Sequence, residues 1–188
     1  GAFDSAGKVT NMGGRMARLP VDVHIARMVL EAERLGVVDD IVTIAACLTA
    51  DGIRDRSGNW KSLTQEKDSD LLAERDCFDA MRESRGVDFR EAGIFGKALF
   101  RAREVRRNLA DALRSVGIRF GSTGDRTDII KAICAGMVDH LFRSQGYGTY
   151  RNGGNGDREL GRESVLKSAY DSPEWIVGQP FDLEITNR

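Results

Sequence analysis

The sequence contains little proline and few aromatic residues: three prolines and 7% aromatic side chains in 188 residues. Aromatic and β-branched side chains favour strands, so this composition points to helices rather than to a β-sandwich. The chain also lacks an apolar run near the roughly 20 residues that a membrane-spanning helix needs, and residues 1–4 do not resemble a signal peptide. We therefore expect a mainly helical, cytoplasmic protein without a membrane partner.

Cysteines are also few and scattered. Cys47, Cys77 and Cys134 lie far apart, without a C-x-x-C pair. Each lies in an apolar helical pattern, which favours buried free thiols over metal ligands. An odd number of scattered cysteines also fits a reducing compartment such as the cytoplasm.

Neither sign of charge dominates, because 28 basic side chains oppose 29 acidic ones and the net charge is −1. Such a chain exerts no overall attraction on nucleic acid, so any nucleic-acid binding needs a local basic patch. Hydrophobic residues make up 41% of the chain, enough to form a core. The length suits one compact domain or two small ones.

Motifs of common catalytic centres are missing as well. The Gly-Lys pairs at 7–8 and 96–97 lack the other residues of a phosphate-binding P-loop, and neither H-E-x-x-H nor G-x-S-x-G occurs. His24 and His140 fall on separate predicted helices, where ordinary helix positions are favoured over a catalytic or metal role. Residues 121–124 (GSTG) could cradle an anion ahead of a helix, but a plain loop is favoured. We expect the chain itself to be catalytically inactive, and a stand-alone hydrolase is disfavoured.

Apolar residues at helical spacing predict about five helices. Asp22 is the expected N-cap of the first and Gly36 its C-terminal glycine. Ser69 is the expected N-cap of the third, and Asp125 or Thr127 that of the fifth. The predicted helices span residues 22–35, 38–50, 69–81, 89–116 and 127–143.

The segments outside these helices are short or polar. Residues 1–20 are expected to form a hairpin and a connector. The polar stretch 51–66 is a long loop, which Trp60 and Leu63 are expected to pin to the core.

The composition changes near residues 144–147, where a glycine-rich sequence with strand-like patterns begins. Further strands are predicted at 173–177 and 181–185; in the second, Phe181, Leu183 and Ile185 alternate with polar residues. The predicted fold is thus mainly α, a helical bundle followed by a small, partial antiparallel β segment of three to five strands.

Basic residues gather on the predicted helix 89–116. Helical angles place Lys97 and Arg101 on the flank of its apolar face, where a groove wall with neighbouring helices can form. Both are therefore candidate phosphate contacts, although solvated surface is the alternative. Arg103, Arg107 and Arg114 fall nearly opposite the apolar face and indicate a solvated stripe.

The β segment mixes basic and aromatic side chains, a combination typical of barrels that bind single strands. Ordinary surface charge with core tyrosines explains the pattern equally well. The residues concerned are Arg151, Arg158, Arg162, Lys167, Tyr147 and Tyr150.

Five stretches, in order, are similar to the helicase-associated region of DEAH-box RNA helicases. This chain departs from the family pattern at three positions: Val23 stands where proline is usual, Asn108 stands where glutamine is usual, and Leu71 stands where eukaryotic members have histidine. The K-D-S-D form of residues 67–70 resembles bacterial relatives. The stretches are GRMARLPVD with IARM (14–22, 25–28), LGVVDDIVTIAACL (35–48), KDSDLLA (67–73), RAREVRRNL (101–109), and ESVL with PEWIV (163–166, 173–177).

This resemblance implies three parts: the end of a winged helix (1–20), a helical ratchet (21–145) and a partial OB-fold (146–188). RecA-like domains of the same parent protein would bind ATP and Mg²⁺ and hydrolyse ATP, and no cofactor is expected in this chain. The ratchet and OB-fold would hold single-stranded RNA, with single-stranded DNA as the alternative. A helical protein–protein interaction module without a nucleic-acid role stays open as the alternative. The candidate nucleic-acid contacts are Lys67, Ser69, Asp70, Lys97, Arg101, Arg151, Arg158 and Arg162.

Overall fold

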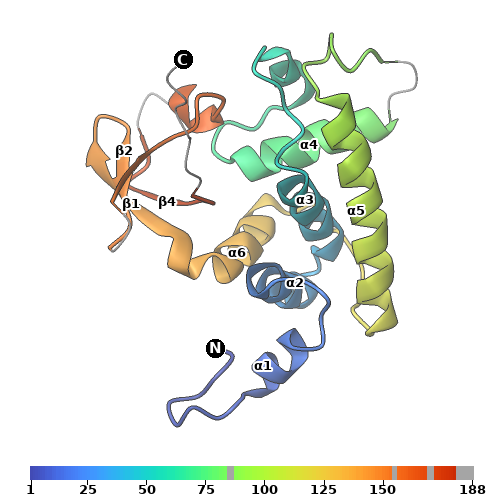
Figure 1. Ribbon diagram of the computed structural model, residues 1–188, viewed down its shortest axis with the longest axis vertical. Coiled ribbons are helices and arrows are strands. Elements are labelled where there is room, and N and C mark those ends of the chain that lie inside the picture. The colour runs from blue at the N-terminus through green and yellow to red at the C-terminus, as the bar shows by residue number, and fades with distance from the viewer. Residues whose placement is uncertain (84–86, 154–155, 169–171, 181–188) are drawn as a thin grey trace, which may run out of the picture.

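A computed structural model describes residues 1–83, 87–153, 156–168 and 172–180 of the chain (Figure 1). Within these ranges the prediction of a mainly helical fold followed by a small antiparallel sheet is confirmed. None of the helices in these ranges is long and apolar enough to cross a bilayer. The α-helices are α1 (Asn11–Met16), α2 (Val23–Leu35), α3 (Val38–Thr49), α4 (Asp70–Glu83), α5 (Gly96–Ser115) and α6 (Arg126–Gly136).

The sheet follows α6 directly and lies on the opposite side of α3 and α4 from α5 (Figure 1). Its strand order is β3-β2-β1-β4, with antiparallel neighbours. The predicted strand at 181–185 lies outside the described residues. The strands are β1 (Leu141–Gly146), β2 (Thr149–Arg151), β3 (Asp157–Glu159) and β4 (Trp175–Val177), and the 3₁₀ turns are η1 (Asn59–Leu63), η2 (Val138–His140) and η3 (Val165–Ser168).

Helices α2, α3 and α4 form close to where the sequence predicts them, and the end signals of α2 and α4 are local. The Asp22 carboxylate accepts hydrogen bonds from the backbone N–H groups of His24 and Ile25, and Gly36 takes the left-handed conformation at φ 77°. Ser69 Oγ accepts the N–H of Leu72, 3.3 Å away, at the start of α4. These three predicted caps are confirmed, and of the two candidates for the fifth helix Asp125 caps α6 by accepting the N–H of Asp128 at 2.9 Å.

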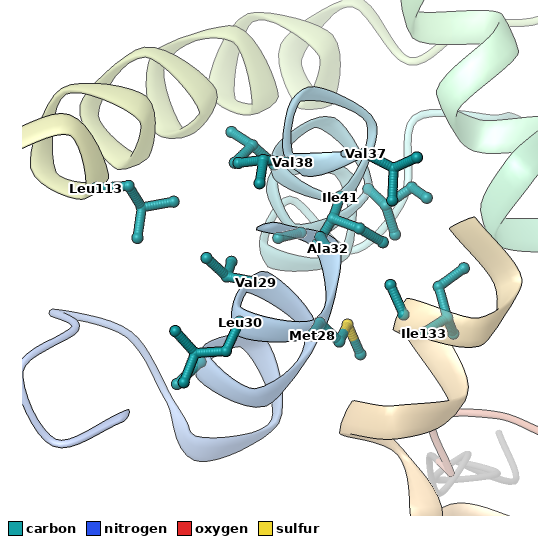
Figure 2. Close-up of a cluster of buried hydrophobic side chains, with 14 of the residues drawn as sticks. Met28, Val29, Leu30, Ala32, Val37, Val38, Ile41, Leu113 and Ile133 are labelled. Atoms are coloured by element: carbon teal, nitrogen blue, oxygen red, sulfur yellow. The ribbon is translucent and has the colours of Figure 1, made fainter. Parts of the chain in front are cut away.

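The main core lies between α2, α3, α5 and α6, which all contribute apolar side chains to it (Figure 2). Met28 and Val29 of α2 are fully buried there, between Leu113 of α5 and Ile133 of α6. Since α2 packs against α6 and α3 against α5, elements distant in sequence are joined through one apolar cluster. Removing this surface from water is the main driving force for the helical arrangement.

A second apolar cluster forms around the loop 51–66. Trp60 is buried, its indole N–H donates to the carbonyl oxygen of Asp55, and Leu63 packs against the same cluster. The prediction that these two side chains pin the loop is confirmed. Cys47 and Cys77 are buried here as free thiols, and burial raises the pKa of Cys77 to about 12. Cys134, in contrast, is only half-buried.

Helix α5 begins at Gly96, so the predicted start at residue 89 is wrong. Gly93 closes a turn at φ 71°, and a Cβ there would lie 2.7 Å from the backbone nitrogen of Trp60. The Phe95 N–H then donates to the carbonyl oxygen of Ile53, and Ile94 pairs with Arg54 in an antiparallel bridge. Pairing with the loop at 53–54 therefore holds residues 94–95 extended, although their apolar side chains fit the helical pattern.

Helix α6 ends at Gly136, and the predicted end at residue 143 is also wrong. Leu141 and Phe142 belong to β1, where strand pairing joins them to Val177 and Ile176 of β4. The apolar residues of 137–142 fit a helical period, but Leu141 and Phe142 pair with residues more than 30 positions along the chain. The β part therefore begins at Leu141 rather than near residues 144–147.

The N-terminal hairpin is present, with Phe3 paired antiparallel to Val9. The connector after it contains a helix, α1, which the sequence pattern did not predict. Its two glycines, Gly13 and Gly14, lower helix propensity, but Thr10 caps it by accepting the N–H of Gly13.

Candidate nucleic-acid interface

The exposed face of the sheet carries one row of charged and aromatic side chains. Strand register places Arg151 of β2 beside Arg143 of β1, and Arg143 beside Trp175 of β4. Alternation along the strands turns Phe142 and Tyr150 to the opposite, buried face. The Arg143 guanidinium lies 5.4 Å from the Trp175 ring centroid, within the range of a cation–π contact. Trp175 is 51% exposed, so one ring face can receive a planar ligand.

The two arginines of this row make only solvent-exposed ion pairs. Arg143 lies 3.2 Å from Glu174, and Arg151 binds Asp157 through contacts of 2.6 and 3.0 Å. The Asp157 contact raises the pKa of Arg151 through hydrogen bonding and charge. Exposed pairs of this kind contribute little free energy, so a phosphate group could compete for either guanidinium.

Other residues predicted on the β segment take different positions. Tyr150 is a core residue whose hydroxyl donates to the carbonyl oxygen of Pro173 at 3.0 Å. Arg158 pairs with Tyr150 in register and is half-buried on the inner face. Tyr147 occupies the fully exposed hairpin tip at φ 54°, and Arg162 is exposed before η3. Of the four predicted basic positions here, only Arg151 lies in the exposed row; Lys167 is exposed on η3.

The start of α4 is occupied mainly by internal contacts. Asp70 forms an ion pair with Arg54 at 2.8 Å and accepts hydrogen bonds from the Ser164 hydroxyl at 2.6 Å and the Val165 N–H at 3.0 Å. Because Ser164 and Val165 belong to the β segment, Asp70 joins this segment to the helices. Ser69 caps the helix, and the Lys67 side chain is exposed.

Lys97 and Arg101 lie at the beginning of α5, on the other side of the molecule from the sheet (Figure 1). Both are exposed, and Arg101 approaches Asp51 at 3.7 Å. The predicted contacts therefore do not form one continuous surface.

The predicted solvated stripe on α5 is wrong for one of its three arginines. Arg103 is half-buried and donates to the carbonyl oxygen of Met81 at 2.8 Å. It lines a groove of about 270 Å³ between α4 and α5. Arg107 and Arg114 are exposed and line the same groove, together with Arg82.

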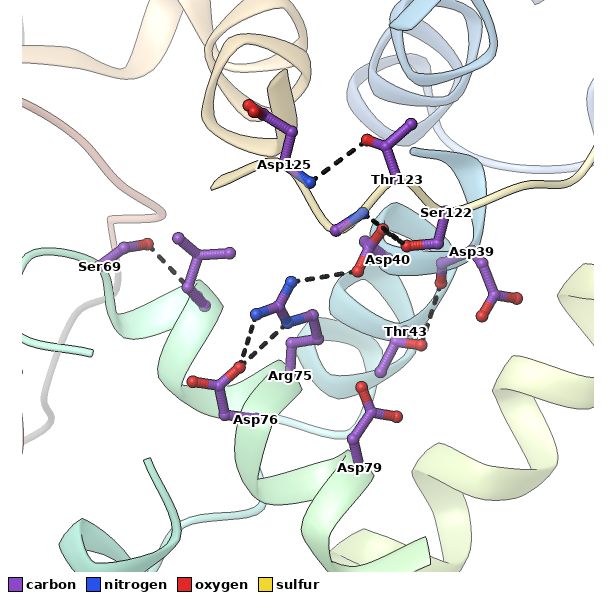
Figure 3. Close-up of polar contacts among 12 residues, drawn as sticks. Asp39, Asp40, Thr43, Ser69, Arg75, Asp76, Asp79, Ser122, Thr123 and Asp125 are labelled. Atoms are coloured by element: carbon purple, nitrogen blue, oxygen red, sulfur yellow. Dashed lines mark hydrogen bonds and ion pairs between the residues drawn. The ribbon is translucent and has the colours of Figure 1, made fainter. Parts of the chain in front are cut away.

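The loop 121–124 is a connecting loop rather than an anion cradle. Its N–H groups at Thr123 and Gly124 donate to Gly36 and to the Ser122 hydroxyl, so they are already used. The Ser122 hydroxyl in turn donates to Asp40, which Arg75 of α4 also binds (Figure 3). This polar network fixes the loop against α3 and α4.

One comparison with known proteins bears on this arrangement. Residues 22–89 match the family model described as helicase associated domain (HA2), ratchet-like. This segment is similar to that domain. It covers α2, α3, η1 and α4, so the match supports a helicase-associated region in the helical half of the chain. Lys67, Ser69 and Asp70 lie inside the matched helicase-associated segment, whereas α5 and the sheet lie outside it.

The candidate residues predicted from the sequence do not include Arg143 and Trp175, two of the three residues of the exposed row. Phe142, Arg143 and Ser144 alternate between apolar and polar side chains, as a strand does. The helical spacing of apolar residues also continues through them, so the sequence pattern predicted a helix here. Because the sequence pattern did not predict β1, it could not predict that Arg143 lies beside Trp175.

An acid-sensitive contact joins the matched segment to α6. Arg126 donates two hydrogen bonds of 2.9 Å to the Glu66 carboxylate, which also accepts the N–H groups of Lys67 and Asp68. Burial alone would raise the pKa of Glu66, but these hydrogen bonds outweigh it and hold the pKa below its ordinary value of 4.5. Ionised Glu66 therefore stabilises the fold above about pH 4.5, and this contribution is lost as the pH falls through the folded-state pKa.

We expect Glu66→Gln to lower the free energy of unfolding by about 1 kcal/mol at pH 7 and by much less at pH 3. Urea unfolding at both pH values measures the difference. Glu91→Gln, at an exposed carboxylate, should have the same small effect at both. An equal loss for Glu66→Gln at the two pH values would contradict the role of this ion pair.

Proposed function

We propose that this chain is the nucleic-acid-guiding accessory region of a bacterial-type DEAH-box RNA helicase. In this role it holds single-stranded RNA while RecA-like domains of the same parent protein hydrolyse ATP. The observation that carries the proposal is the juxtaposition of two features: a helicase-associated segment at 22–89 and an exposed basic and aromatic row on the sheet. Asp70 connects the two, because it lies in the segment and binds the β segment directly.

ATP and Mg²⁺ belong, in this proposal, to the RecA-like domains. Neither Gly-Lys pair of this chain supplies the P-loop pattern that holds the phosphates of ATP, since Gly7–Lys8 lies in the N-terminal hairpin and Gly96–Lys97 begins α5. The chain would contribute strand binding alone, and the parent protein would work in the cytoplasm.

A single strand can be held by stacking together with phosphate contacts. Trp175 offers an exposed ring face on which any base can stack, and stacking tolerates all sequences because every base has a π-face. Arg143 and Arg151 lie along the same row and can bind successive phosphates in place of their exposed carboxylate partners. With a net charge of −1, the chain should bind weakly and with strong salt dependence.

We expect Trp175→Ala to weaken single-stranded RNA binding about 5- to 150-fold, because loss of one base–aromatic stack costs roughly 1–3 kcal/mol. Arg143→Ala should weaken binding and flatten the dependence of log affinity on log salt by about 0.7 for the lost phosphate contact. Fluorescence anisotropy with a labelled, unstructured RNA oligonucleotide at several salt concentrations measures both quantities.

Two variants show where the strand binds. Phe100→Ala is the matched control, because Phe100 is exposed to a similar extent but lies on α5; it should leave affinity unchanged. Lys97→Ala with Arg101→Ala tests the second basic position. If only that double variant loses affinity, the RNA contact lies on α5 and not on the sheet. If the folded wild-type chain does not bind RNA even at low salt, the chain does not bind RNA on its own.

A second candidate is a helical protein-interaction module. Exposed Phe95 and Phe100 at the start of α5 and the arginine-lined groove beside it favour this function, since such a surface suits an acidic, partly apolar partner. Under this alternative, RNA affinity is negligible or insensitive to every variant above.

A further inference from the structure

The chain contains only two histidines, and the fold brings both to one place. His24 lies in the first turn of α2, and His140 ends η2, directly before β1. Their rings are stacked, with centroids 4.9 Å apart and planes inclined by 29°. The two residues lie on separate elements, as expected, but His140 ends η2 and is not part of the helix predicted for residues 127–143, which ends at Gly136. We propose that His24, His140 and Asp139 form a Zn²⁺ site at this junction.

The contact of His24 with the helix end prepares one of its nitrogens for a metal. Its Nδ1 lies 2.8 Å from the carbonyl oxygen of Gly136, which can only accept a hydrogen bond, so Nδ1 carries the proton. Nε2 then keeps its lone pair. A backbone carbonyl that orients the non-coordinating N–H is the usual support of a metal-binding histidine.

The remaining two ligands come from η2. Asp139 Oδ1 lies 3.5 Å from the protonated Nδ1 of His24, so the carboxylate has to turn toward Nε2 of the same ring to share a metal with it. The Nδ1 atom of His140 is buried and has no hydrogen-bond partner among the described residues, which leaves a polar atom that a metal could satisfy. One ligand atom from each of the three side chains lies within 4.8 Å of the others.

These distances and ligand types favour zinc. Bonds of about 2.0–2.2 Å in a tetrahedral arrangement place ligand atoms roughly 3.4 Å apart, so closing the site requires the three side chains to move closer together. Two imidazoles and one carboxylate are a borderline donor set that suits Zn²⁺, whereas Mg²⁺ prefers oxygen ligands alone. Water would complete the fourth position.

The backbone of η2 is already held in place for such a site. The Asn152 amide donates to the carbonyl oxygen of Asp139 at 2.7 Å, and the N–H of Gly178 donates to that of His140 at 3.2 Å. The ligand-bearing turn is thus tied to the β segment, while His24 belongs to α2. A bound Zn²⁺ would cross-link the helical half of the chain to the sheet, independently of any RNA contact.

Thermal unfolding of the chain, prepared without a histidine tag, tests the site. At a Zn²⁺ concentration of about 100 times Kd, the Tm of the wild-type chain should rise by about 5 °C or more, because a ligand of the folded state stabilises it. Mg²⁺ at the same concentration should give no shift. His140→Ala and Asp139→Asn should each weaken Zn²⁺ binding, measured by calorimetry, at least about tenfold, since even a lost supporting hydrogen bond costs that much.

Asp139→Asn should still fold, because the Asp139 side chain is exposed and asparagine has the same shape, so the zinc affinity of this variant can be measured. Cys134→Ser is the control for binding by a thiol, because Cys134 is half-buried on the neighbouring α6, and it should leave the zinc response intact. The proposal fails if Zn²⁺ does not stabilise the wild-type chain, if Mg²⁺ acts equally, if both ligand variants retain full affinity, or if Cys134→Ser abolishes binding.

Discussion

Replacing Arg54 by alanine is expected to lower the free energy of unfolding by about 3–5 kcal/mol, the usual cost of removing one partner from a buried ion pair. The Arg54 side chain is only 8% exposed and lies 2.8 Å from both Asp70 and Glu74. Its guanidinium also stacks 4.3 Å above the Trp60 ring. Burial lowers the pKa of Arg54, but the two carboxylates outweigh this effect and raise it, so the group stays charged.

The loss of stability in Arg54→Ala would affect both the helices and the β segment. Without Arg54, Glu74 remains buried as an uncompensated charge while it still accepts the N–H of Ile53 at 2.9 Å. Asp70 also loses its ion pair, although it must still accept the hydrogen bonds from Ser164 and Val165 that attach the β segment. Urea unfolding, followed separately by helical signal and by Trp fluorescence, measures the total loss.

Two further variants distinguish the buried charge from the loss of side-chain volume. Arg56→Ala removes an arginine from the same loop, but Arg56 is exposed and lies 3.6 Å from Glu163, so a change below about 0.5 kcal/mol is expected. Adding Glu74→Gln to Arg54→Ala should recover part of the loss, because it removes the charge and keeps an oxygen for the Ile53 N–H. A loss below about 1 kcal/mol for Arg54→Ala itself would contradict the argument.

Gly136→Ala is the second substitution with a large expected effect, a destabilisation of about 3 kcal/mol or more from overpacking. A Cβ at this position would lie 2.3 Å from Met28 Cγ and 2.5 Å from the carbonyl oxygen of His24. A side-chain rotation could relieve the first contact. The second involves backbone, so relief requires α2 and α6 to move apart and to open the main core.

Gly14→Ala provides the matched control. Gly14 also lies in a helix, but a Cβ there meets nothing within 4 Å. Alanine should therefore be neutral or stabilising by up to about 1 kcal/mol. Thermal and urea unfolding of both variants measure the contrast. If Gly136→Ala unfolded within 2 °C of the wild type, about the shift that 0.5–1 kcal/mol produces, the close approach of α2 and α6 would not be a rigid constraint.

The candidate site was predictable only in part. Arg151 stands out from the sequence because it lies among the mixed basic and aromatic residues of the β segment, and the structure places it in the exposed row. Asp70 stands out as well, yet its carboxylate binds Arg54, Ser164 and Val165 inside the molecule. No local pattern distinguishes a carboxylate that faces solvent from one that holds two parts of the chain together.

The sequence by itself determined the mainly helical fold and the ends of α2 and α4. These features depend on hydrogen bonds between residues two to four apart and on the 3.6-residue period of apolar side chains. Only the tertiary structure decided where α5 begins, where α6 gives way to β1, and which residues gather at the exposed row and the histidine pair. At each of these points, a contact with a distant segment outweighs the local preference, because strand pairing and close backbone packing satisfy groups that the local pattern cannot assign.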